Sequence, residues 1–227
     1  MFILRWLVKK FPNASQRFLE ILPGLTSWSL ILFPIWGSIL TPLAVAYYII
    51  AFDVYWLYRS LTLAALSLLA HFRIKAGENY DWMGDVAGFP DWKKVYHGVI
   101  IPNYKEPGHT LARTLRSLAR QTLGAKQIIP IVAFEVRAGE ELNREREKML
   151  SGEFGGVFAK LMFTYHPTDI KGEVVGKSAN SAWGASQLMK EVEKHKNWDP
   201  DMMTVSSTDA DVVFHPNHFA ALTYKFL

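Results

Sequence analysis

The first part of the chain carries almost no charged positions over a long apolar stretch. No Asp, Glu, Lys or Arg occurs between Glu20 and Asp53, a run of 32 residues. With interruptions only at Asp53 and Arg59, the apolar character continues to Ala70. A helix needs roughly 20 apolar residues to cross a bilayer, at about 1.5 Å of rise per residue. The length of this stretch therefore predicts two membrane-spanning helices.

A cluster of turn-forming residues divides the apolar region, which we take as residues 21–75. The cluster consists of Gly37, Ser38, Thr41 and Pro42. It predicts a first span near 22–39 and a second near 43–58, with a further helix along the interface over 60–72. Residues 1–20 alternate Phe, Leu and Trp with Lys and Arg. We expect this amphipathic segment to lie on the membrane surface.

Two features of the apolar region stay open at this stage. One kinked span near 25–50, followed by a short second span, fits the same composition. Asp53 lies near the membrane boundary in either arrangement, where a carboxylate can be functional or simply paired with a neighbour. The aromatic residues just before Arg59 are typical of a membrane interface with a basic anchor.

The basic residues are concentrated beside the apolar region. Residues 1–75 carry seven Lys/Arg and two Asp/Glu, a net charge of +5, whereas residues 76–227 carry 18 and 19, a net charge of −1. Two spans place both basic flanks on one side, which the positive-inside rule makes the cytoplasm. We therefore expect a multi-pass protein of the inner, cytoplasmic membrane with its polar domain in the cytoplasm. The polar part has no basic excess to suggest nucleic-acid binding.

Composition excludes two further classes. The chain contains no cysteine, so it can have neither a disulfide framework nor a thiolate metal site. Half of the residues are hydrophobic and 20% are charged, which excludes wholesale disorder.

Residues 96–227 alternate apolar runs with amphipathic stretches, after a linker rich in Gly, Asp and Pro over 76–95. The apolar runs predict strands at 97–101, 127–134, 160–165 and 203–207. The amphipathic stretches predict helices at 110–123, 140–150 and 178–194, of which the second is strongly charged and expected to be solvated. This order predicts an α/β fold with a mostly parallel, Rossmann-like sheet. Ligands of such sheets bind beyond the carboxyl ends of the strands.

The first candidate motif, Ile101-Pro-Asn-Tyr-Lys-Glu-Pro107, directly follows a predicted strand. At that position Tyr104 can stack on a base and the carboxylate of Glu106 can accept a hydrogen bond from a ribose hydroxyl. An ordinary turn containing Pro102 would produce the same sequence, so the motif alone does not distinguish a binding loop from a simple turn.

Two more motifs carry groups suited to a phosphate. Asp209 and Asp211 follow the last predicted strand, and two such carboxylates can hold a hard divalent cation whose shell is completed by phosphate oxygens. Lys177 directly precedes the helix predicted over 178–194, where it can reach a phosphate with help from the helix amides. The alternatives are a chance Asp-x-Asp and a solvated lysine at a capped helix start.

Taken together, the three motifs resemble the family 2 glycosyltransferases of the GT-A type, in their membrane-anchored bacterial branch. The resemblance covers 97–227 and implies two transmembrane helices followed by a nucleotide-sugar-binding domain. It implies a nucleoside diphosphate sugar as donor, Mg²⁺ or Mn²⁺ as cofactor, and inverting transfer to an unknown acceptor. The donor-binding residues that it implies are Pro102, Tyr104, Glu106, Glu135, Lys177, Asn180 and Asp209. The metal ligands that it implies are Asp209 and Asp211.

The chain departs from the family pattern at two places. In Phe134-Glu-Val-Arg137, Glu135 stands where the family usually keeps an Asp that reads the base. The acidic acceptor base that follows the Asp-x-Asp in the family is not found in 212–227, so we expect 96–227 to be the donor-binding half of a GT-A domain without a catalytic base. Two alternatives are a non-catalytic nucleotide-binding membrane module and a metal-dependent nucleotidyl or phosphoryl transferase. The latter usually has a glycine-rich phosphate loop, whereas 102–110 contain a single glycine.

Overall fold

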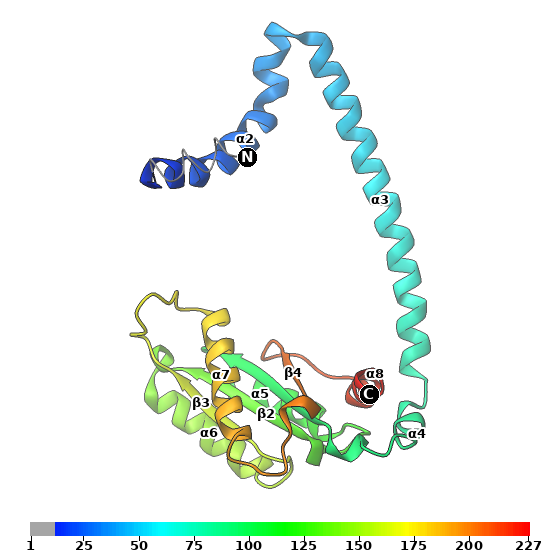
Figure 1. The fold of residues 1–227 in the computed structure, drawn as a ribbon, viewed down its shortest axis with the longest axis vertical. Helices are drawn as coiled ribbons and strands as arrows, with labels where there is room; N and C mark the ends of the chain where they lie inside the picture. Colours follow the sequence, from blue (N-terminus) through cyan, green and yellow to red (C-terminus); the bar gives the residue numbers. More distant parts are fainter. Residues whose placement is uncertain (1–11) are drawn as a thin grey trace. The chain divides into compact units, whose positions relative to one another are not determined.

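The structure is a computed structural model that describes residues 12–227, shown in Figure 1. These residues belong to two compact units, with the boundary between Arg73 and Ile74. The first unit is helical and the second contains a sheet with helices. Most of the surface segment expected over 1–20 lies outside the described residues.

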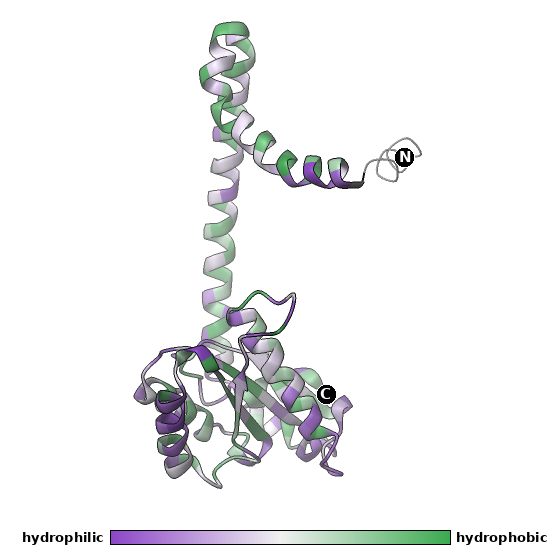
Figure 2. Ribbon diagram, turned by 90° about the vertical axis from the view of Figure 1, so that its left-hand side faces the viewer, coloured by the Kyte–Doolittle hydropathy of each residue, from purple (hydrophilic) through white to green (hydrophobic). Residues whose placement is uncertain are grey.

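The first unit consists of two long apolar helices. These are α2 (Pro12–Leu40) and α3 (Pro42–Glu78), and only Thr41 lies between them. Their most apolar windows have mean hydropathies of 1.5 and 1.3, and hydrophobic residues predominate around the turn in Figure 2. Both helices are long and apolar enough to cross a membrane, which confirms the predicted pair and suggests membrane association. The turn falls within the predicted cluster.

The helix boundaries differ from those expected. α3 runs without a break to Glu78, so the stretch over 60–72 is a continuation of the second helix and not a separate one. Nothing in that stretch interrupts a helix, because it contains neither proline nor glycine. α2 begins at Pro12 and not near residue 22 as expected, and it contains Pro23 and Pro34 in its interior. Figure 1 shows that α2 bends along its length, as interior prolines cause.

A hydrogen bond between the two helices compensates for Pro34. Because proline has no N–H, Pro34 leaves the carbonyl of Leu30 without its donor in the helix. The hydroxyl of Tyr48 in α3 donates to this carbonyl at 3.1 Å, and its ring packs edge-on against Phe33 with centroids 5.2 Å apart. Close packing is possible because Gly37 faces Val45, whose Cγ2 would lie 2.9 Å from an added Cβ. In an apolar medium an unpaired carbonyl costs several kcal/mol, so this contact stabilises the hairpin.

The bond from Tyr48 to Leu30 can be tested by a double-mutant cycle. Tyr48→Phe is expected to destabilise the helix hairpin by about 0.6–2 kcal/mol, and less in a Pro34→Ala background, where the restored N–H satisfies Leu30. The measurement is the unfolding free energy of the chain in detergent. Tyr47→Phe is the matched control, since Tyr47 is exposed and its hydroxyl makes no hydrogen bond in the described part of the chain. Equal losses in both backgrounds would contradict this account.

The second unit is built on a four-stranded parallel sheet. Its strands are β1 (Tyr96–Asn103), β2 (Ile128–Glu135), β3 (Met162–His166) and β4 (Met203–Ser207). They are arranged in the order β3-β2-β1-β4, and Gly98 of β1 pairs with Ile129 on one side and Val205 on the other. The α/β class and the parallel sheet are therefore confirmed. The two central strands, β1 and β2, are buried and mostly apolar along their length, which explains why the sequence revealed them.

Helices cover both faces of this sheet. The helices of the unit are α4 (Trp82–Val86), α5 (Gly108–Ala119), α6 (Glu140–Phe154), α7 (Lys177–Val192) and α8 (His218–Phe226). Short 3-10 turns are η1 (Trp92–Lys94), η2 (Ala125–Gln127), η3 (Val136–Ala138) and η4 (Pro200–Met202). Successive residues of β2 point to opposite faces. Ile131 packs with Leu188 of α7, whereas Val132 belongs to the core on the side of α5 and α6.

Two expectations for this unit were wrong in part. The stretch 76–95 is not a plain linker, because it contains α4, whose Trp82 packs on Tyr224 of α8 with ring centroids 5.5 Å apart. The charged helix at 140–150 is not solvated on every side, because α6 buries Leu150 and two polar residues, Asn143 and Arg146. These buried positions recur at helical spacing, and the many charges between them obscure the stripe.

A buried histidine joins β1, β4 and α8. The ring nitrogens of His97 lie 2.6 Å from the hydroxyl of Thr204 and 2.8 Å from that of Thr223. Its ring also packs against Phe219, with centroids 5.1 Å apart. Burial, which disfavours the charged imidazolium, and to a smaller extent the charge of nearby His218 together lower the pKa of His97 to about 4. His97 is therefore a neutral core residue at physiological pH.

Candidate functional site

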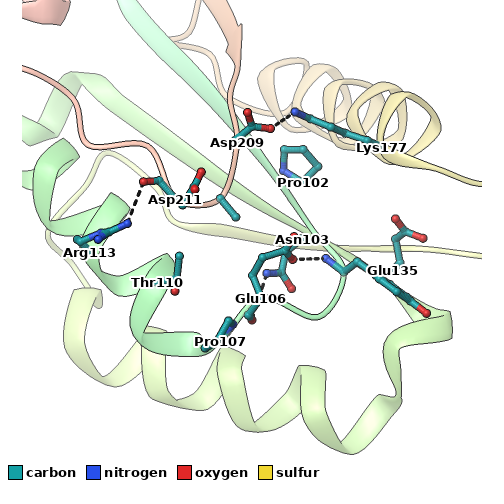
Figure 3. A pocket seen from close by; sticks show the side chains of 12 residues that line it. Pro102, Asn103, Glu106, Pro107, Thr110, Arg113, Glu135, Lys177, Asp209 and Asp211 are labelled. Atoms are coloured by element: carbon teal, nitrogen blue, oxygen red, sulfur yellow. Dashed lines mark hydrogen bonds and ion pairs between the residues drawn. The ribbon is translucent and has the colours of Figure 1, made fainter.

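The strand order places a switch point between β1 and β4. From β1 the chain adds β2 and β3 in one direction, and it then returns through α7 to place β4 on the other side of β1. Ligands of open α/β sheets bind at such a reversal, outside the carboxyl ends of the strands. A cavity of about 550 Å³ lies there (Figure 3). Its lining residues are Pro102, Asn103, Tyr104, Glu106, Pro107, Thr110, Arg113, Glu135, Lys177, Asp209, Ala210 and Asp211.

All but one of the site residues expected from the sequence line this cavity. The exception is Asn180, which is fully buried in α7 and does not reach it. Its Nδ2 donates to the carbonyl of Ala133 at 2.7 Å, which fixes α7 against β2. Its Oδ1 has no hydrogen-bond partner among the described residues. Asn180 therefore holds α7 against β2 and is not itself available to a ligand in the cavity.

The loop after β1 is held in shape by its own carboxylate. One oxygen of Glu106 accepts hydrogen bonds from the backbone N–H groups of Tyr104, at 2.8 Å, and Lys105, at 3.1 Å. The amide of Asn103 donates to the backbone carbonyl of Glu106 at 3.4 Å. Glu106 thus shapes the loop, and its other oxygen makes no hydrogen bond within the described part of the chain.

A buried arginine from α6 supports the same loop, and the sequence did not reveal it. The guanidinium of Arg146 donates to Oδ1 of Asn103 at 3.1 Å and to the carbonyl of Tyr104 at 3.4 Å. Burial lowers the pKa of Arg146, and the charge of Glu106 acts in the opposite direction. The signal that could have identified Arg146 is its spacing from Leu150 on one helix face.

Polar residues of α5 anchor the segment that carries the two aspartates. The hydroxyl of Thr114 donates to the carbonyl of Ala210 at 2.7 Å, and Arg113 donates to the backbone carbonyl of Asp211 at 3.1 Å. The N–H of Thr208 continues the β1–β4 ladder by donating to Ile100 at 3.0 Å. Both ends of the Asp-x-Asp turn are therefore fixed through their backbone groups. This leaves the carboxylate of Asp211 without a bond in the described part of the chain, whereas that of Asp209 pairs with Lys177.

Positive and negative side chains alternate around the mouth of the cavity. Lys177, at the first position of α7, forms an ion pair with Asp209, and the two point toward each other in Figure 3. Arg113 lies on the other side of the turn, beside Asp211. The side chains of Lys177 and Asp209 are 57% and 65% exposed, so water screens their attraction and a ligand can replace it.

The end of β2 contributes a different kind of group. The side chain of Glu135 is only 5% exposed and forms an ion pair with Arg137 of η3. The guanidinium of Arg137 lies 4.4 Å from the centre of the Tyr104 ring, in cation–π geometry. Asn143 of α6 donates to the backbone carbonyl of Glu135 at 2.9 Å. Glu135 is therefore held in place from both sides.

The carboxylates of the cavity suit a divalent cation only with help from a bound molecule. Among residues 12–227 no three His, Asp or Glu side chains lie close enough together to hold a metal ion. Asp209 and Asp211 together offer hard oxygen ligands on one turn, as Mg²⁺ and Mn²⁺ prefer. Mg²⁺ is commonly held by one or two carboxylates plus substrate phosphates. This donor set fits a metal that arrives with a diphosphate.

Comparison with known proteins does not assign the chain to a family. No protein-family model matches it, and a search of curated proteins finds no match. The geometry of the cavity and the two apolar helices therefore carry the functional conclusion.

Proposed function

We propose that this protein is a membrane-anchored glycosyltransferase of the GT-A type, or its donor-binding part, which binds a nucleoside diphosphate sugar with Mg²⁺ or Mn²⁺. The observation that carries the proposal is the cavity at the switch point of the sheet. It gathers an aromatic ring, two cations and two neighbouring aspartates from separate parts of the chain. The aromatic ring suits a base, the two cations suit a diphosphate, and the two aspartates suit a metal ion.

Each part of the donor has a matching group in the cavity. The ring of Tyr104 offers a stacking surface for the base, and the free oxygen of Glu106 can accept from a ribose hydroxyl. Lys177 and Arg113 both line the cavity, and their positive charges would bind the diphosphate. Asp209 and Asp211 would hold the cation, which when bound neutralises charge on the departing diphosphate.

A binding module without transfer activity is the second candidate, and the carboxylates of the cavity favour it. Glu135 is paired with Arg137, Glu106 is engaged in its own loop, and Asp209 and Asp211 are assigned to the cation. Among the described residues that line the cavity, no further carboxylate is left to deprotonate an acceptor hydroxyl. The two candidates share the donor site and differ in the acceptor chemistry.

Binding and turnover experiments test both candidates. The purified chain in detergent is titrated calorimetrically with nucleoside diphosphates, in Mg²⁺ and in excess chelator. We expect binding that requires the metal. Release of nucleoside diphosphate from nucleotide sugars, with product analysis, then distinguishes a transferase from a binding module. If no nucleoside diphosphate binds in Mg²⁺ or Mn²⁺, the proposal is wrong.

The proposed access to cytosolic donor requires a defined topology. Reporter fusions at residues 15, 40 and 90 are expected to score inside, outside and inside, because two spans return the chain to the side of its basic flanks. Reporters that are active only in the cytoplasm and only outside it, used in parallel, provide the control. An outside score at residue 90 would place the cavity away from cytosolic nucleotide sugars and contradict the proposed localisation in the inner membrane.

A further inference from the structure

α3 stays apolar almost to the point where the second unit begins. No Asp, Glu, Lys or Arg occurs between Arg59 and Arg73, and the second unit begins at Ile74. The leucines of this run are 56–67% exposed and point to all sides of the helix: Leu61, Leu63, Leu66, Leu68 and Leu69. A helix that is apolar all round belongs in a protein core or in lipid. Because the described chain leaves these leucines exposed, we expect lipid to cover the run as far as Phe72.

The last turn of α3 is fastened by side chains of the second unit. Nε1 of Trp82 donates to the carbonyl of Gly77 at 2.7 Å, and Nδ2 of Asn217 donates to that of Glu78 at 3.3 Å. Gly77 follows Phe72 in the same helix, by about 8 Å along the axis at about 1.5 Å per residue. The polar layer on each side of a bilayer is roughly 5–8 Å thick. The indole of Trp82 is therefore tied to α3 at a height that matches the lipid headgroups.

Trp82 belongs to a cluster of aromatic side chains at α4 and α8, which lie side by side in Figure 1. The ring centroids of Tyr80 and Tyr224 lie 4.8 and 5.5 Å from that of Trp82, and Nζ of Lys225 lies 5.9 Å from the Trp82 ring centre. Tyr80 is 48% exposed and Tyr224 38%. The hydroxyl of Tyr224 makes no hydrogen bond within the described part of the chain. We call these four side chains the aromatic patch.

We propose that the aromatic patch lies in the headgroup layer of the membrane that α3 enters, and so docks the second unit on the bilayer surface. Trp and Tyr are enriched in this layer because their rings are apolar while their N–H or O–H groups can stay hydrated. The inference rests on the two apolar helices and not on the proposed function. Since α8 begins shortly after Asp211, docking would also keep the candidate site close to the membrane.

The charges around the patch are balanced, so the rings and not the charges are expected to hold it to lipid. Residues 73–89 and α8 contain three basic residues, Arg73, Lys75 and Lys225, and three acidic residues, Glu78, Asp81 and Asp85. Attraction to anionic lipid requires a basic excess, and salt screens it. Docking should therefore need neither anionic lipid nor low ionic strength.

A label at the edge of the patch tests its depth. Because the chain has no cysteine, Lys225→Cys introduces a single site for a bimane label and leaves the three rings intact. The labelled full chain is placed in nanodiscs of phosphatidylcholine and phosphatidylethanolamine. Lipids with a nitroxide on the headgroup should quench this label several-fold more strongly than a label on Arg144→Cys, and aqueous iodide should quench it less. Arg144 is the matched control, because its side chain on α6 is 74% exposed.

A second substitution tests the contribution of the rings. In the labelled Lys225→Cys chain, Tyr224→Ser should reduce the headgroup quenching toward the value of the control position. Trp198→Ser is the control for this loss, because Trp198 is a partly buried aromatic residue that packs on Tyr96 in a separate cluster. If Tyr224→Ser does not fold, the two labelled positions in the otherwise unmodified chain still decide the matter.

Three results would overturn the inference. Equal headgroup quenching at positions 225 and 144 would place the aromatic patch in water. Quenching that appears only when phosphatidylglycerol is added, and that salt removes, would make charge the cause. Protection of the label from both the headgroup nitroxide and iodide would mean that a protein surface, such as a second copy of this chain, covers the patch. Stronger headgroup quenching at position 225 that persists in salt without anionic lipid would support docking through the rings.

Discussion

Asp211→Asn is expected to weaken the binding of nucleoside diphosphate in Mg²⁺ by about 2–4 kcal/mol, the loss typical of removing one charge from a desolvated, hydrogen-bonded pair. Arg113 binds the backbone carbonyl of Asp211 and not its carboxylate. The substitution therefore removes a carboxylate that we propose to bind the metal, without releasing the turn from α5. Calorimetric titration of the two proteins in Mg²⁺ gives the difference directly.

The control for this substitution is Asp201→Asn. Asp201 is exposed in η4, and it does not line the cavity. In excess chelator, the unmodified chain and Asp211→Asn should bind equally weakly, because the lost interaction passes through the metal. A loss that is the same with and without metal would mean that Asp211 acts on the nucleotide or on the fold, and the metal assignment would be wrong.

Asp209 is expected to respond differently from Asp211. Asp209→Asn removes a proposed metal ligand but also releases Lys177 from its ion pair, so that the ammonium can interact with the diphosphate. The two contributions oppose each other, which should make its loss in Mg²⁺ smaller than that of Asp211→Asn. Without metal, Asp209→Asn should bind no more weakly than the unmodified chain.

Much of the sheet and its loops could be predicted from the sequence, for an identifiable reason. Parallel strands are buried on both faces, so β1 and β2 are continuous apolar runs that stand out from the amphipathic helices between them. The polar residues that directly follow these strands must then meet at one edge of the sheet. This reasoning predicted that Tyr104 and Asp209 lie at one edge of the sheet. Lys177 follows β3 only after a long loop, and it was predicted from its place at the start of a helix.

The sequence did not reveal the site residues whose position depends on packing between distant elements. Arg113 and Arg146 are two of many charged residues on helices. Only the spacing of Arg146 from Leu150 distinguishes it, and nothing local distinguishes Arg113. Arg146 is buried because α6 lies under the loop after β1, a contact that spans about 40 residues of chain. Asn180 was expected near the diphosphate, but its helix turns it toward the backbone of β2. Helical spacing alone does not say which face a second element will cover.

The helix hairpin shows the same limit on a smaller scale. The turn at Thr41 follows from local sequence, because small residues and a proline interrupt an apolar run. The bond from Tyr48 to the carbonyl exposed by Pro34 does not, because it depends on how the two helices align. A proline inside an apolar helix predicts a free carbonyl, and only the structure identifies its donor.

The stability of the second unit should fall as the pH decreases from about 6.5 to about 4, because of His97. In the folded chain its pKa is about 4, whereas an exposed histidine has its ordinary pKa of 6.5. Below pH 6.5 the unfolded chain therefore takes up a proton that the folded chain does not, and folding loses free energy. The loss of folding free energy begins below pH 6.5, increases until about pH 4 and does not increase further below pH 4. In total it amounts to roughly 3 kcal/mol.

Denaturant unfolding of the chain in detergent between pH 4 and pH 7.5 measures this slope, and His97→Gln is the test variant. Glutamine can keep hydrogen bonds to Thr204 and Thr223 but does not titrate, so the variant should be less stable at pH 7.5 and lose less stability as the pH falls. His109→Gln, at an exposed position of α5, should keep the slope of the unmodified chain. His218 packs near His97, and burial lowers its pKa as well, so His218→Gln should remove a smaller part of the slope. An unchanged slope in His97→Gln would show that carboxylates, and not the buried imidazole, set the acid sensitivity of the fold.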